Sequence, residues 1–596
     1  MVLPYGTCPE KKRSSQTHGQ RQPCINTIYM KLKLPPGLLL LLTAFPVFFS
    51  AAQDTDSADR VPWYKNCLFY SIEVGTFKDS DGNGIGDFKG LTEKLNYLDS
   101  LGVDALWLAP FYPSPKQDDG YDVTDYYSID SLYGTEEDFR EFLARAHSKG
   151  IKVISDIVLN HTSIAHPWFR EARADKKSPY RTWYVWADER PEDAGKGMVF
   201  PGVQKETWTF DSIAGQYYFH RFYKFQPDLN YSYTQVQQEA FKILRYWLRK
   251  GMDGYRLDAV PFIIDRPETG SERPERIMDL VPKMRNVMKL EKEDALMLGE
   301  ANLSPEENKD YFGADNNGMQ MMFNFYVNQY LFYALASGKI RLLKKALEDT
   351  KEKPEAAQWG HFLRNHDEID LARLKEKQRN EVFRRFGPDS AMQLYHRGIR
   401  RRLAPMLQDS SQIRFAYNLL FSLPGTPVIR YGEEIGMGDD LTLKERLSVR
   451  TPMQWSGEPN AGFTEAPRAF REVIDEGPYH YKQVNVAAQL KDSGSLLNFI
   501  KKTAQLRKQH PEIGAGHFTI LPVSSRFVLA MRYQYKDRVL LTLHNFSDKP
   551  QKFRIKSKAL KGKQLLQVTD GLAVNPGQVS LEGYGFGWYV IKDAHR

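Results

Sequence analysis

Short apolar segments alternate with amphipathic segments along most of this chain, and this alternation limits the possible folds more than any other feature. The first apolar segments are LFYSIEV (68–74), ALWLAP (105–110) and IKVISDIVLN (151–160). Between them, residues 88–102 and 135–150 carry apolar side chains at helical spacing. Alternating strands and helices predict a parallel sheet, and the run is long enough for a closed (β/α)8 TIM barrel.

The alternation is interrupted after Asn160. Residues 163–228 are irregular and aromatic, which predicts a domain inserted after the third strand. The alternation returns with a helix at 239–251 and five further strands. We predict these strands at 254–260, 295–301, 321–325, 359–367 and 426–432. The barrel is therefore expected over 60–162 and 229–505.

The C-terminal part of the chain has a different pattern. Apolar and polar residues alternate in RFVLAMRYQY (526–535), RVLLTLHNF (538–546) and GFGWYVI (585–591). A period of two predicts half-buried antiparallel strands. The fold is therefore expected to be α/β, a barrel with an inserted domain and a C-terminal antiparallel β-sandwich at 510–596.

Residues 30–52 have the pattern of a signal peptide. Two lysines precede an apolar core at 37–49, and small residues at 50–52 suit cleavage. A membrane anchor is the alternative, although the core is short for a span. Residues 1–29 are polar and without pattern, and we interpret Met30 as the true start. The mature protein is then predicted to be exported, periplasmic or secreted, without stable membrane insertion.

Charge and cysteine content limit the partners and cross-links. The formal net charge is +8, but residues 1–52 hold six Lys and Arg against one acidic residue. The remainder carries no basic cluster, so no nucleic-acid partner is predicted. Of the three cysteines only Cys67 follows the leader, so no internal disulfide is expected in the mature chain.

Three carboxylates stand where predicted barrel strands end: Asp258, Glu300 and Asp367. Active residues of such barrels lie at the carboxyl ends of strands, and two carboxylates flanking a sugar bond can cleave a glycoside. Arg256 shares a strand face with Asp258, and its charge would keep that carboxylate ionised. The alternative is a purely structural Arg–Asp pair.

The segment DSDGNGIGD (79–87) carries oxygen ligands at alternate positions. Asp79, Asp81, Asn83 and Asp87, with the carbonyl of Ile85, would suit a hard cation such as Ca²⁺. The alternative is a Gly/Asp turn without an ion. The cation would be structural, because the loop is remote from the three carboxylates. No organic cofactor is expected.

Six segments together resemble the α-amylase family, glycoside hydrolase family 13. They are DGYDVTDY (119–126), DIVLNH (156–161), QPDLN (226–230), GYRLDAV (254–260), LGEAN (298–302) and FLRNHDE (362–368). The resemblance implies that Asp258 is the nucleophile and Glu300 the general acid/base. Asp367 would bind the 2- and 3-hydroxyls of the sugar.

The same resemblance implies further contacts with the sugar. Arg256, His161 and His366 would contact it at the reaction subsite, and Tyr121 would stack under its ring. Isolated histidines are more often structural, but both of these lie inside the family motifs.

The segment VRTPMQW (449–455) resembles the α-glucosidase branch of the family. There the motif arginine pairs with an aspartate just before the GYD segment and closes the inner end of the pocket, which implies an Arg450–Asp118 pair. A closed pocket of this kind admits one terminal glucose and favours short α-glucosides.

Several stretches, above all GIRRRLAPML (398–407), resemble the trehalose synthases, which interconvert maltose and trehalose. The implied reaction is intramolecular glucosyl transfer through a covalent glucosyl–aspartate. The export signal and the segment 442–455 depart from the usual pattern of that group. Two alternatives stay open. One is an exported α-glucosidase or α-amylase acting on short α-glucosides, and the other is a non-catalytic binding module of the same fold.

Overall fold

The computed structural model describes residues 61–264, 277–314, 316–561, 563–569, 574–575 and 578–593. The predicted leader at 30–52 and the segment before it lie outside these residues. Among the residues described, no helix is long and apolar enough to span a bilayer.

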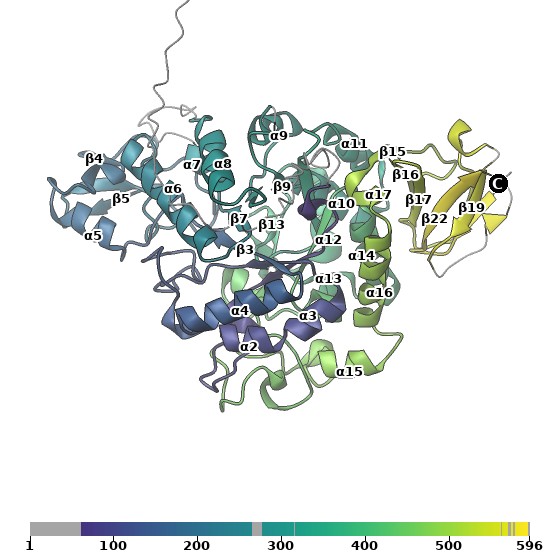
Figure 1. The fold of residues 1–596 in the computed structure, drawn as a ribbon, viewed down its shortest axis with the longest axis horizontal. Helices are drawn as coiled ribbons and strands as arrows, with labels where there is room; N and C mark the ends of the chain where they lie inside the picture. The colour runs from purple at the N-terminus through teal and green to yellow at the C-terminus, as the bar shows by residue number, and fades with distance from the viewer. Residues whose placement is uncertain are drawn as a thin grey trace, which may run out of the picture. The chain divides into compact units, whose positions relative to one another are not determined.

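Eight parallel strands close into a barrel in the order β1, β2, β3, β7, β8, β9, β10, β14 and back to β1. Their bounds are Phe69–Ile72, Ala105–Leu108, Lys152–Ile157, Gly254–Leu257, Leu296–Gly299, Met321–Phe323, Gln358–Phe362 and Thr426–Arg430. Seven strands lie within segments predicted from the sequence, and β10 begins one residue before its predicted segment, so the predicted eight-stranded barrel is confirmed (Figure 1).

Alternate residues of the barrel strands pack on opposite sides of the sheet, as pleated strands require. Phe69, Trp107 and Leu298 belong to an apolar cluster that fills the barrel interior. Their neighbours Tyr70 and Leu106 belong to the larger cluster formed with the surrounding helices. Both faces of the strands are therefore buried, which explains why the strand sequences are almost continuously apolar.

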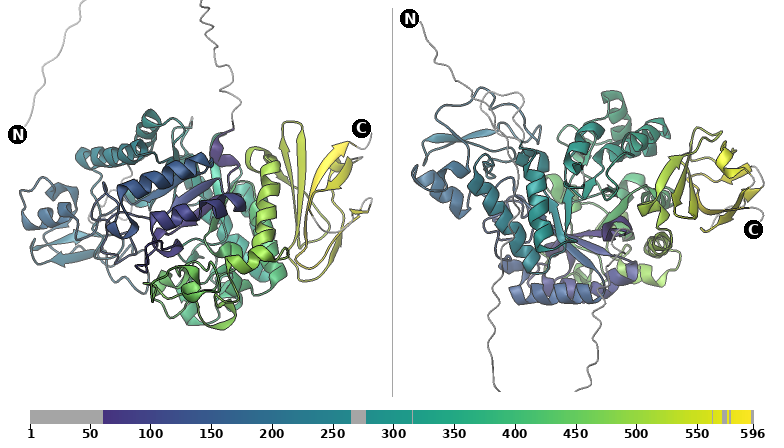
Figure 2. Two further views of the ribbon diagram at one scale, coloured as in Figure 1. Left: turned by 60° about the horizontal axis from the view of Figure 1, so that its bottom comes forward. Right: turned by 45° about the horizontal axis from the view of Figure 1, so that its top comes forward.

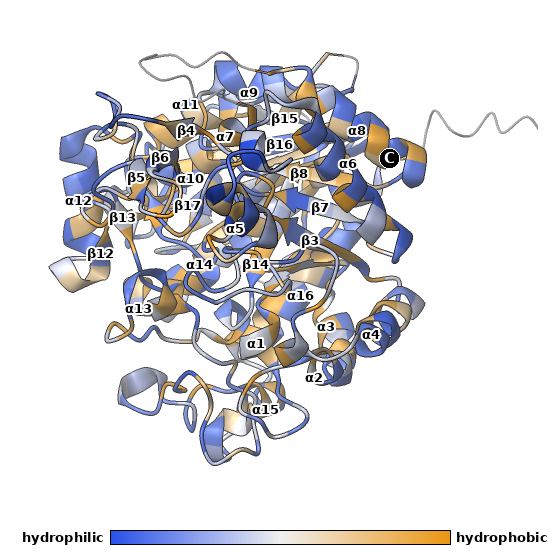
Figure 3. Ribbon diagram, turned by 90° about the vertical axis from the view of Figure 1, so that its left-hand side faces the viewer, coloured by the Kyte–Doolittle hydropathy of each residue, from blue (hydrophilic) through white to orange (hydrophobic). Residues whose placement is uncertain are grey.

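Helices follow the strands and cover the barrel (Figure 2). They include α4 (Glu136–Ser148), α6 (Thr234–Arg249), α8 (Leu280–Glu291), α10 (Phe325–Ser337), α11 (Arg341–Asp349), α12 (Glu376–Phe386), α14 (Ser410–Ser422) and α16 (Leu496–Gln509). Figure 3 shows hydrophilic and hydrophobic bands on α6 and α8, as expected for helices with one buried face. Helix α4 begins with a capping box between Thr135 and Asp138.

The helix predicted over 88–102 is divided in two. It comprises α2 (Phe88–Glu93) and α3 (Leu95–Leu101), because the N–H of Lys94 bonds Leu91 and tightens the chain there. Gly102 ends α3 in a left-handed conformation, φ 92°.

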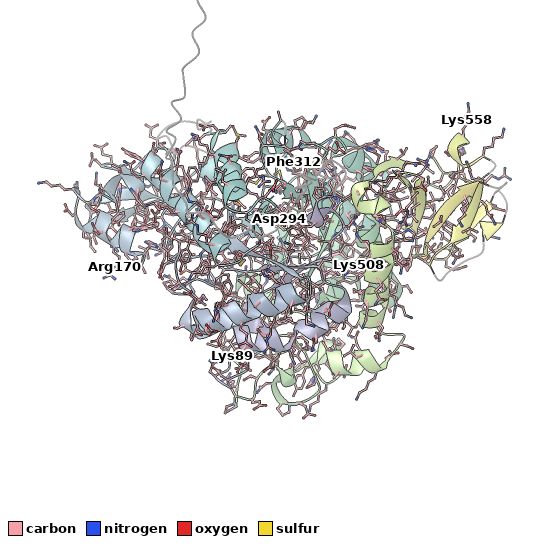
Figure 4. All side chains as sticks on the ribbon, viewed as in Figure 1. Lys89, Arg170, Asp294, Phe312, Lys508 and Lys558 are labelled. Atoms are coloured by element: carbon pink, nitrogen blue, oxygen red, sulfur yellow. The ribbon has the colours of Figure 1, made fainter. Side chains whose placement is uncertain are left out.

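Figure 4 labels Lys89, Arg170 and Lys558 at the periphery of the view, and all three are exposed. Phe312, labelled in the same view, is 1% exposed.

The segment after β3 contributes a separate three-stranded antiparallel sheet in the order β4, β6, β5. Its strands are Trp186–Ala187, Gln216–Phe219 and Trp208–Asp211, and helix α5 (Pro167–Ala174) precedes them. This sheet has an apolar cluster of its own around Trp208 and Phe219. It is the domain that the sequence predicts between the third and fourth barrel strands.

The C-terminal part forms two antiparallel sheets. The larger has the order β15 (His517–Ile520), β16 (Val528–Tyr535), β17 (Arg538–Asn545), β22 (Phe586–Asp593) and β19 (Lys563–Gln567). The smaller has the order β18 (Gln551–Phe553), β21 (Gln578–Leu581) and β20 (Val574–Asn575). Leu541 of the first and Phe553 of the second share one apolar cluster, so the two sheets pack face to face.

Candidate active site

The carboxyl ends of the barrel strands surround a cavity of about 600 Å³. Asp258 follows β7, Glu300 follows β8, and Asp367 lies beyond the end of β10. The cavity is lined by these carboxylates together with Asp118, Tyr121, His161, Phe200, Phe222 and Arg446. A volume of this size lies within the range of sites for small molecules.

Arg256 lies at the centre of the carboxylate group. One nitrogen, Nη1, donates to Asp156 and to Asp258, each at 2.6 Å. The other, Nη2, lies 2.5 Å from Glu300. The arginine is 1% exposed. One buried guanidinium therefore holds three buried or half-buried carboxylates together and offsets part of their charge, which explains how a charged pair is tolerated in an apolar strand.

The two carboxylates expected to react have different proton affinities. Burial raises the pKa of Asp258 to about 6, against the lowering effect of Arg256. Burial raises the pKa of Glu300 to about 7, and the nearby charge of Asp258 contributes to this increase. Near neutral pH, Asp258 is mostly ionised while Glu300 retains much of its proton. These are the ionisation states that a nucleophile and a general acid require.

Asp156 at the end of β3 is a site residue that our sequence analysis did not single out. Trp107 Nε1 and the Tyr121 hydroxyl both donate to its Oδ2, each at 3.0 Å, and Arg256 bonds its other oxygen. The residue is fully buried. Its position as the first residue of DIVLNH was the available signal, because that motif also supplies His161.

The predicted residues Tyr121, His161 and His366 form one connected group. The Tyr121 hydroxyl lies 2.7 Å from His366 Nε2, and its backbone carbonyl lies 3.1 Å from His161 Nε2. Burial lowers the pKa of His161 to about 4, so its ring is neutral near pH 7. Tyr121 and His161 line the cavity, whereas His366 lies behind Tyr121 and beside Asp367. Whether Tyr121 stacks on a sugar ring stays a prediction.

Asp367 is held by three basic groups. Arg446 Nη1 donates to its Oδ1 at 2.9 Å, and Arg450 Nη2 donates to the same oxygen at 3.0 Å. His366 Nε2 lies 3.2 Å from Oδ2. Burial alone would raise the pKa of Asp367. The neighbouring His366 and then the charges of Arg446 and Arg450 hold this pKa well below its usual range, while burial keeps the His366 ring itself neutral near pH 7. Asp367 is therefore an ionised hydrogen-bond acceptor in the cavity wall.

The predicted Arg450–Asp118 ion pair is wrong. Arg450 Nη1 instead bonds Asp119 at 3.1 Å, and Arg471 bonds the other oxygen of Asp119 at 3.0 Å. Asp118 is paired with Arg446 at 2.5 Å. The two adjacent carboxylates therefore bind different arginines. The backbone of Asp119 is left-handed, φ 54°.

The inserted domain contributes part of the cavity wall. Phe200 and Phe222 line the cavity, and Phe222 packs against the ring of His161 with centroids 5.1 Å apart. The Arg446 guanidinium lies 5.0 Å from the centre of the Phe200 ring. The arginine that binds Asp118 and Asp367 is thus covered by an aromatic ring of the inserted domain. Such a cover reduces the access of water to these ion pairs.

The loop 79–87 brings carboxylates together as a cation site would. One ligand atom from each of Asp79, Asp81 and Asp87 lies within 4.8 Å of the others. Asp79 and Asp87 are buried, and Asp79 accepts three backbone N–H bonds from the loop. Two buried carboxylates at this separation favour a compensating charge, and an all-oxygen ligand set suits a hard cation. The geometry therefore fits a Ca²⁺ site.

The chain matches the family model described as alpha amylase, catalytic domain, over residues 72–516. It is similar to the trehalose synthase of Pimelobacter sp., with 38% identity over 564 residues, which cover 91% of this chain and 98% of that enzyme. It is also similar to the trehalose synthase of Thermus thermophilus, with 40% identity over 539 residues. That match covers 89% of this chain but 56% of the Thermus enzyme, so the chain spans about half of its length.

A solved structure, the trehalulose synthase from Pseudomonas mesoacidophila, superposes with a TM-score of 0.72 at 26% identity. The superposition covers 89% of this chain and all of that chain.

Proposed function

The chain belongs to the α-amylase family, in which it is a glycoside hydrolase or transglucosidase, and we propose that it interconverts maltose and trehalose. The proposed reaction is retaining and intramolecular, with a covalent glucosyl ester on Asp258. The observation that carries the chemistry is the Arg256 guanidinium, which binds both Asp258 and Glu300. The choice of substrate rests on the similarity to the trehalose synthase of Pimelobacter, which extends over nearly the whole of both chains.

In the first step, Asp258 attacks the anomeric carbon of the non-reducing glucose of maltose. The bond from that carbon to the leaving oxygen breaks, and Glu300 gives the oxygen its proton. The products are an ester on Asp258, an ionised Glu300 and a free glucose. Retaining enzymes hold the two carboxyl groups about 5–5.5 Å apart, because no water stands between nucleophile and sugar. The shared contact with Arg256 is compatible with such a spacing.

In the second step, Glu300 acts as the base. It accepts the proton of the anomeric hydroxyl of the free glucose, whose oxygen attacks the esterified carbon. The ester bond breaks, Asp258 regains its charge, and an α,α-1,1 bond forms. The same site therefore performs both steps without a redox cofactor, because each step exchanges one bond and one proton.

Isomerisation requires the released glucose to stay in the cavity and water to be excluded. The ion pairs of Asp118 and Asp367 with Arg446 support this retention, because they close one wall with half-buried, paired charges. Phe200 and Phe222 add an apolar cover from the inserted domain. Hydrolysis would dominate if this enclosure were incomplete.

Incubation of the purified protein with maltose alone, followed by NMR of the sugars, tests the proposal. We expect trehalose to accumulate ahead of free glucose. The control is Asp258→Asn, which should form neither product. Glucose as the sole product at early times and high maltose concentration would favour an α-glucosidase. No turnover of any short α-glucoside would favour a binding module.

We also propose that residues 79–87 bind Ca²⁺ through Asp79, Asp81, Asn83 and Asp87 with the carbonyl of Ile85. The support is the convergence of three carboxylates in one loop. The Oδ1 of Asn83 accepts the N–H of Ile85 at 2.7 Å, so the loop is already closed around its oxygen atoms. The ion would stabilise the barrel rather than take part in the chemistry.

The predicted export signal carries a last proposal, that the mature enzyme works outside the cytoplasm. The basis is the pattern of residues 30–52. N-terminal sequencing of protein recovered from a fractionated host would test it, because cleavage near residue 52 should be found only in the exported fraction.

A further inference from the structure

A second, smaller cavity lies at the opposite end of β10 from Asp367. Its lining comes from the end of α11 and the loop after it, from the first residues of β10, and from α17 (Glu512–Ala515) and β15 of the C-terminal region. The lining residues include Thr350, Lys351, Lys353, Gln358, Trp359, His361, Gly514 and His517. It therefore lies where the barrel meets the C-terminal strands.

The cavity carries an excess of positive charge. Lys351 and Lys353 line it, but none of its described lining residues is acidic. Within the described part of the chain, no carboxylate lies within ion-pair distance of Lys353, whose nearest acidic influence is its exposed neighbour Glu352. Glu348, also exposed, approaches Lys351 only at 4.0 Å. The lysines thus face the cavity without a buried counter-charge.

A buried lysine near the two half-buried ones, Lys65, adds to the positive charge. Lys65 is 7% exposed, and its ammonium donates to the backbone carbonyl of Glu355 rather than to a carboxylate. Burial first, and then the positive charge of Lys65, lower the pKa of Lys353 to about 8. Lys353 is therefore still mostly charged near pH 7. Two ammonium groups in a half-buried region, with only the exposed Glu352 and Glu355 as nearby acidic groups, are costly unless an anion joins them.

The size of the cavity limits the anion. Its volume is about 60 Å³, and a water molecule needs roughly 10–15 Å³ measured in this way. The space therefore suits a group of about five heavy atoms, which is the size of a tetrahedral oxyanion. Lys351 is only partly buried and His517 is exposed, so a small ion can enter beside them.

We propose that this basal cavity is a binding site for a small oxyanion of the phosphate or sulfate type, held by Lys353 and Lys351. The bound ion would link the barrel to the C-terminal region through charges from the α11–β10 loop and contacts with α17 and β15. It would act on stability and not on turnover, because the cavity opens at the end of the barrel opposite to the catalytic carboxylates.

Thermal unfolding of the whole protein in sodium phosphate, in sodium sulfate and in sodium chloride at equal ionic strength tests this proposal. A ligand of the folded state raises the melting temperature by mass action, and we expect a rise of about 1–2 °C in phosphate or sulfate beyond that in chloride. Line broadening of the ³¹P resonance of phosphate on adding the protein provides a direct measure of binding. The proposal is overturned if both oxyanions behave as chloride does.

Variants separate this site from general salt effects. Lys353→Met should abolish the specific rise and the ³¹P broadening, and Lys351→Met should reduce both. Lys345→Met is the matched control, because Lys345 lies on the nearby α11 but is exposed and pairs with Asp349 at 2.6 Å. It should respond as the unaltered protein does. Equal responses in all three variants would place the effect elsewhere and refute the site. All three should turn over maltose normally, so this result is independent of the proposed isomerase activity.

Discussion

Arg256 Nη2 lies 2.5 Å from the carboxylate of Glu300, although Arg256 is on β7 and Glu300 follows β8. The same guanidinium bonds Asp258 at 2.6 Å. A single fixed charge thus acts on both reacting groups. A change in the protonation of one carboxyl group therefore changes the pKa of the other.

Asp258→Asn is expected to leave a folded protein with almost no activity. An amide cannot form the glucosyl ester, so the covalent route is lost. The rate enhancement of ~10²–10⁴ from proton transfer by Glu300 is lost as well, because this proton transfer assists the attack by Asp258. Circular dichroism and the initial rate on maltose are the measurements. Near-normal turnover by a well-folded variant would contradict the assignment of the nucleophile.

Glu300→Gln is expected to lose about 10²–10⁴ in rate on maltose but far less on 4-nitrophenyl α-glucoside in the first step. The nitrophenolate leaves without a proton, so formation of the ester no longer needs the acid. A burst of nitrophenol followed by slow turnover should be seen. An equal loss on both substrates, without a burst, would show that Glu300 is not the general acid.

The activity on maltose is expected to follow a narrow bell-shaped dependence on pH. It rises through about pH 6 as Asp258 loses its proton, because the ionised form is the nucleophile. It falls through about pH 7 as Glu300 loses the proton that it must donate. Measurement of kcat/KM between pH 4.5 and 9 gives both limbs of the profile. With the aryl glucoside, the decrease at alkaline pH should be smaller for the first step, because the nitrophenolate leaves without a proton. A rate that stays constant from pH 5 to 9 would be incompatible with these roles.

The barrel and most of the site could be predicted from sequence because each rests on local signals. Strands buried on both faces are continuous apolar runs, so a charged residue at the end of one, such as Glu300, is conspicuous. Pairing between distant loops has no such signal. Asp118 and Asp119 are adjacent and chemically alike, and only the ion pairs of the folded chain show that each binds a different arginine. Arg446 lies in the segment 442–455, which departs from the usual pattern of the trehalose synthases. Its position in the cavity wall could therefore not be predicted from the sequence.

If residues 79–87 bind Ca²⁺, the melting temperature should depend on calcium through the exposed carboxylate of Asp81. Calcium should raise the melting temperature of the protein, and a chelator should lower it, because the ion binds the folded state. Asp81→Asn should remove most of this difference, while Asp99→Asn, an exposed aspartate on α3, should keep it. Both variants should retain full activity at 25 °C. Coincident melts with excess calcium and with chelator, and no metal by elemental analysis, would show that the loop is only a turn.

The last prediction concerns Arg446, which joins Asp118 to Asp367 across the cavity wall at 2.5 and 2.9 Å. Arg446→Met keeps part of the unbranched apolar stem but removes the guanidinium, which leaves the half-buried Asp118 without its arginine and Asp367 with one guanidinium instead of two. An unpaired buried charge costs roughly 1–3 kcal/mol or more, which corresponds to a loss of about 5- to 150-fold in kcat/KM if the cost falls on the transition state. The wall also becomes less closed, so we expect the share of free glucose among the products to rise.

Arg140→Met, which removes an exposed arginine paired with Glu137, is the control and should change neither quantity. The product ratio at early times distinguishes enclosure from simple damage, because a destabilised but closed site would slow trehalose and glucose formation equally. An unchanged ratio together with an unchanged kcat/KM would show that retention of glucose does not depend on this ion pair.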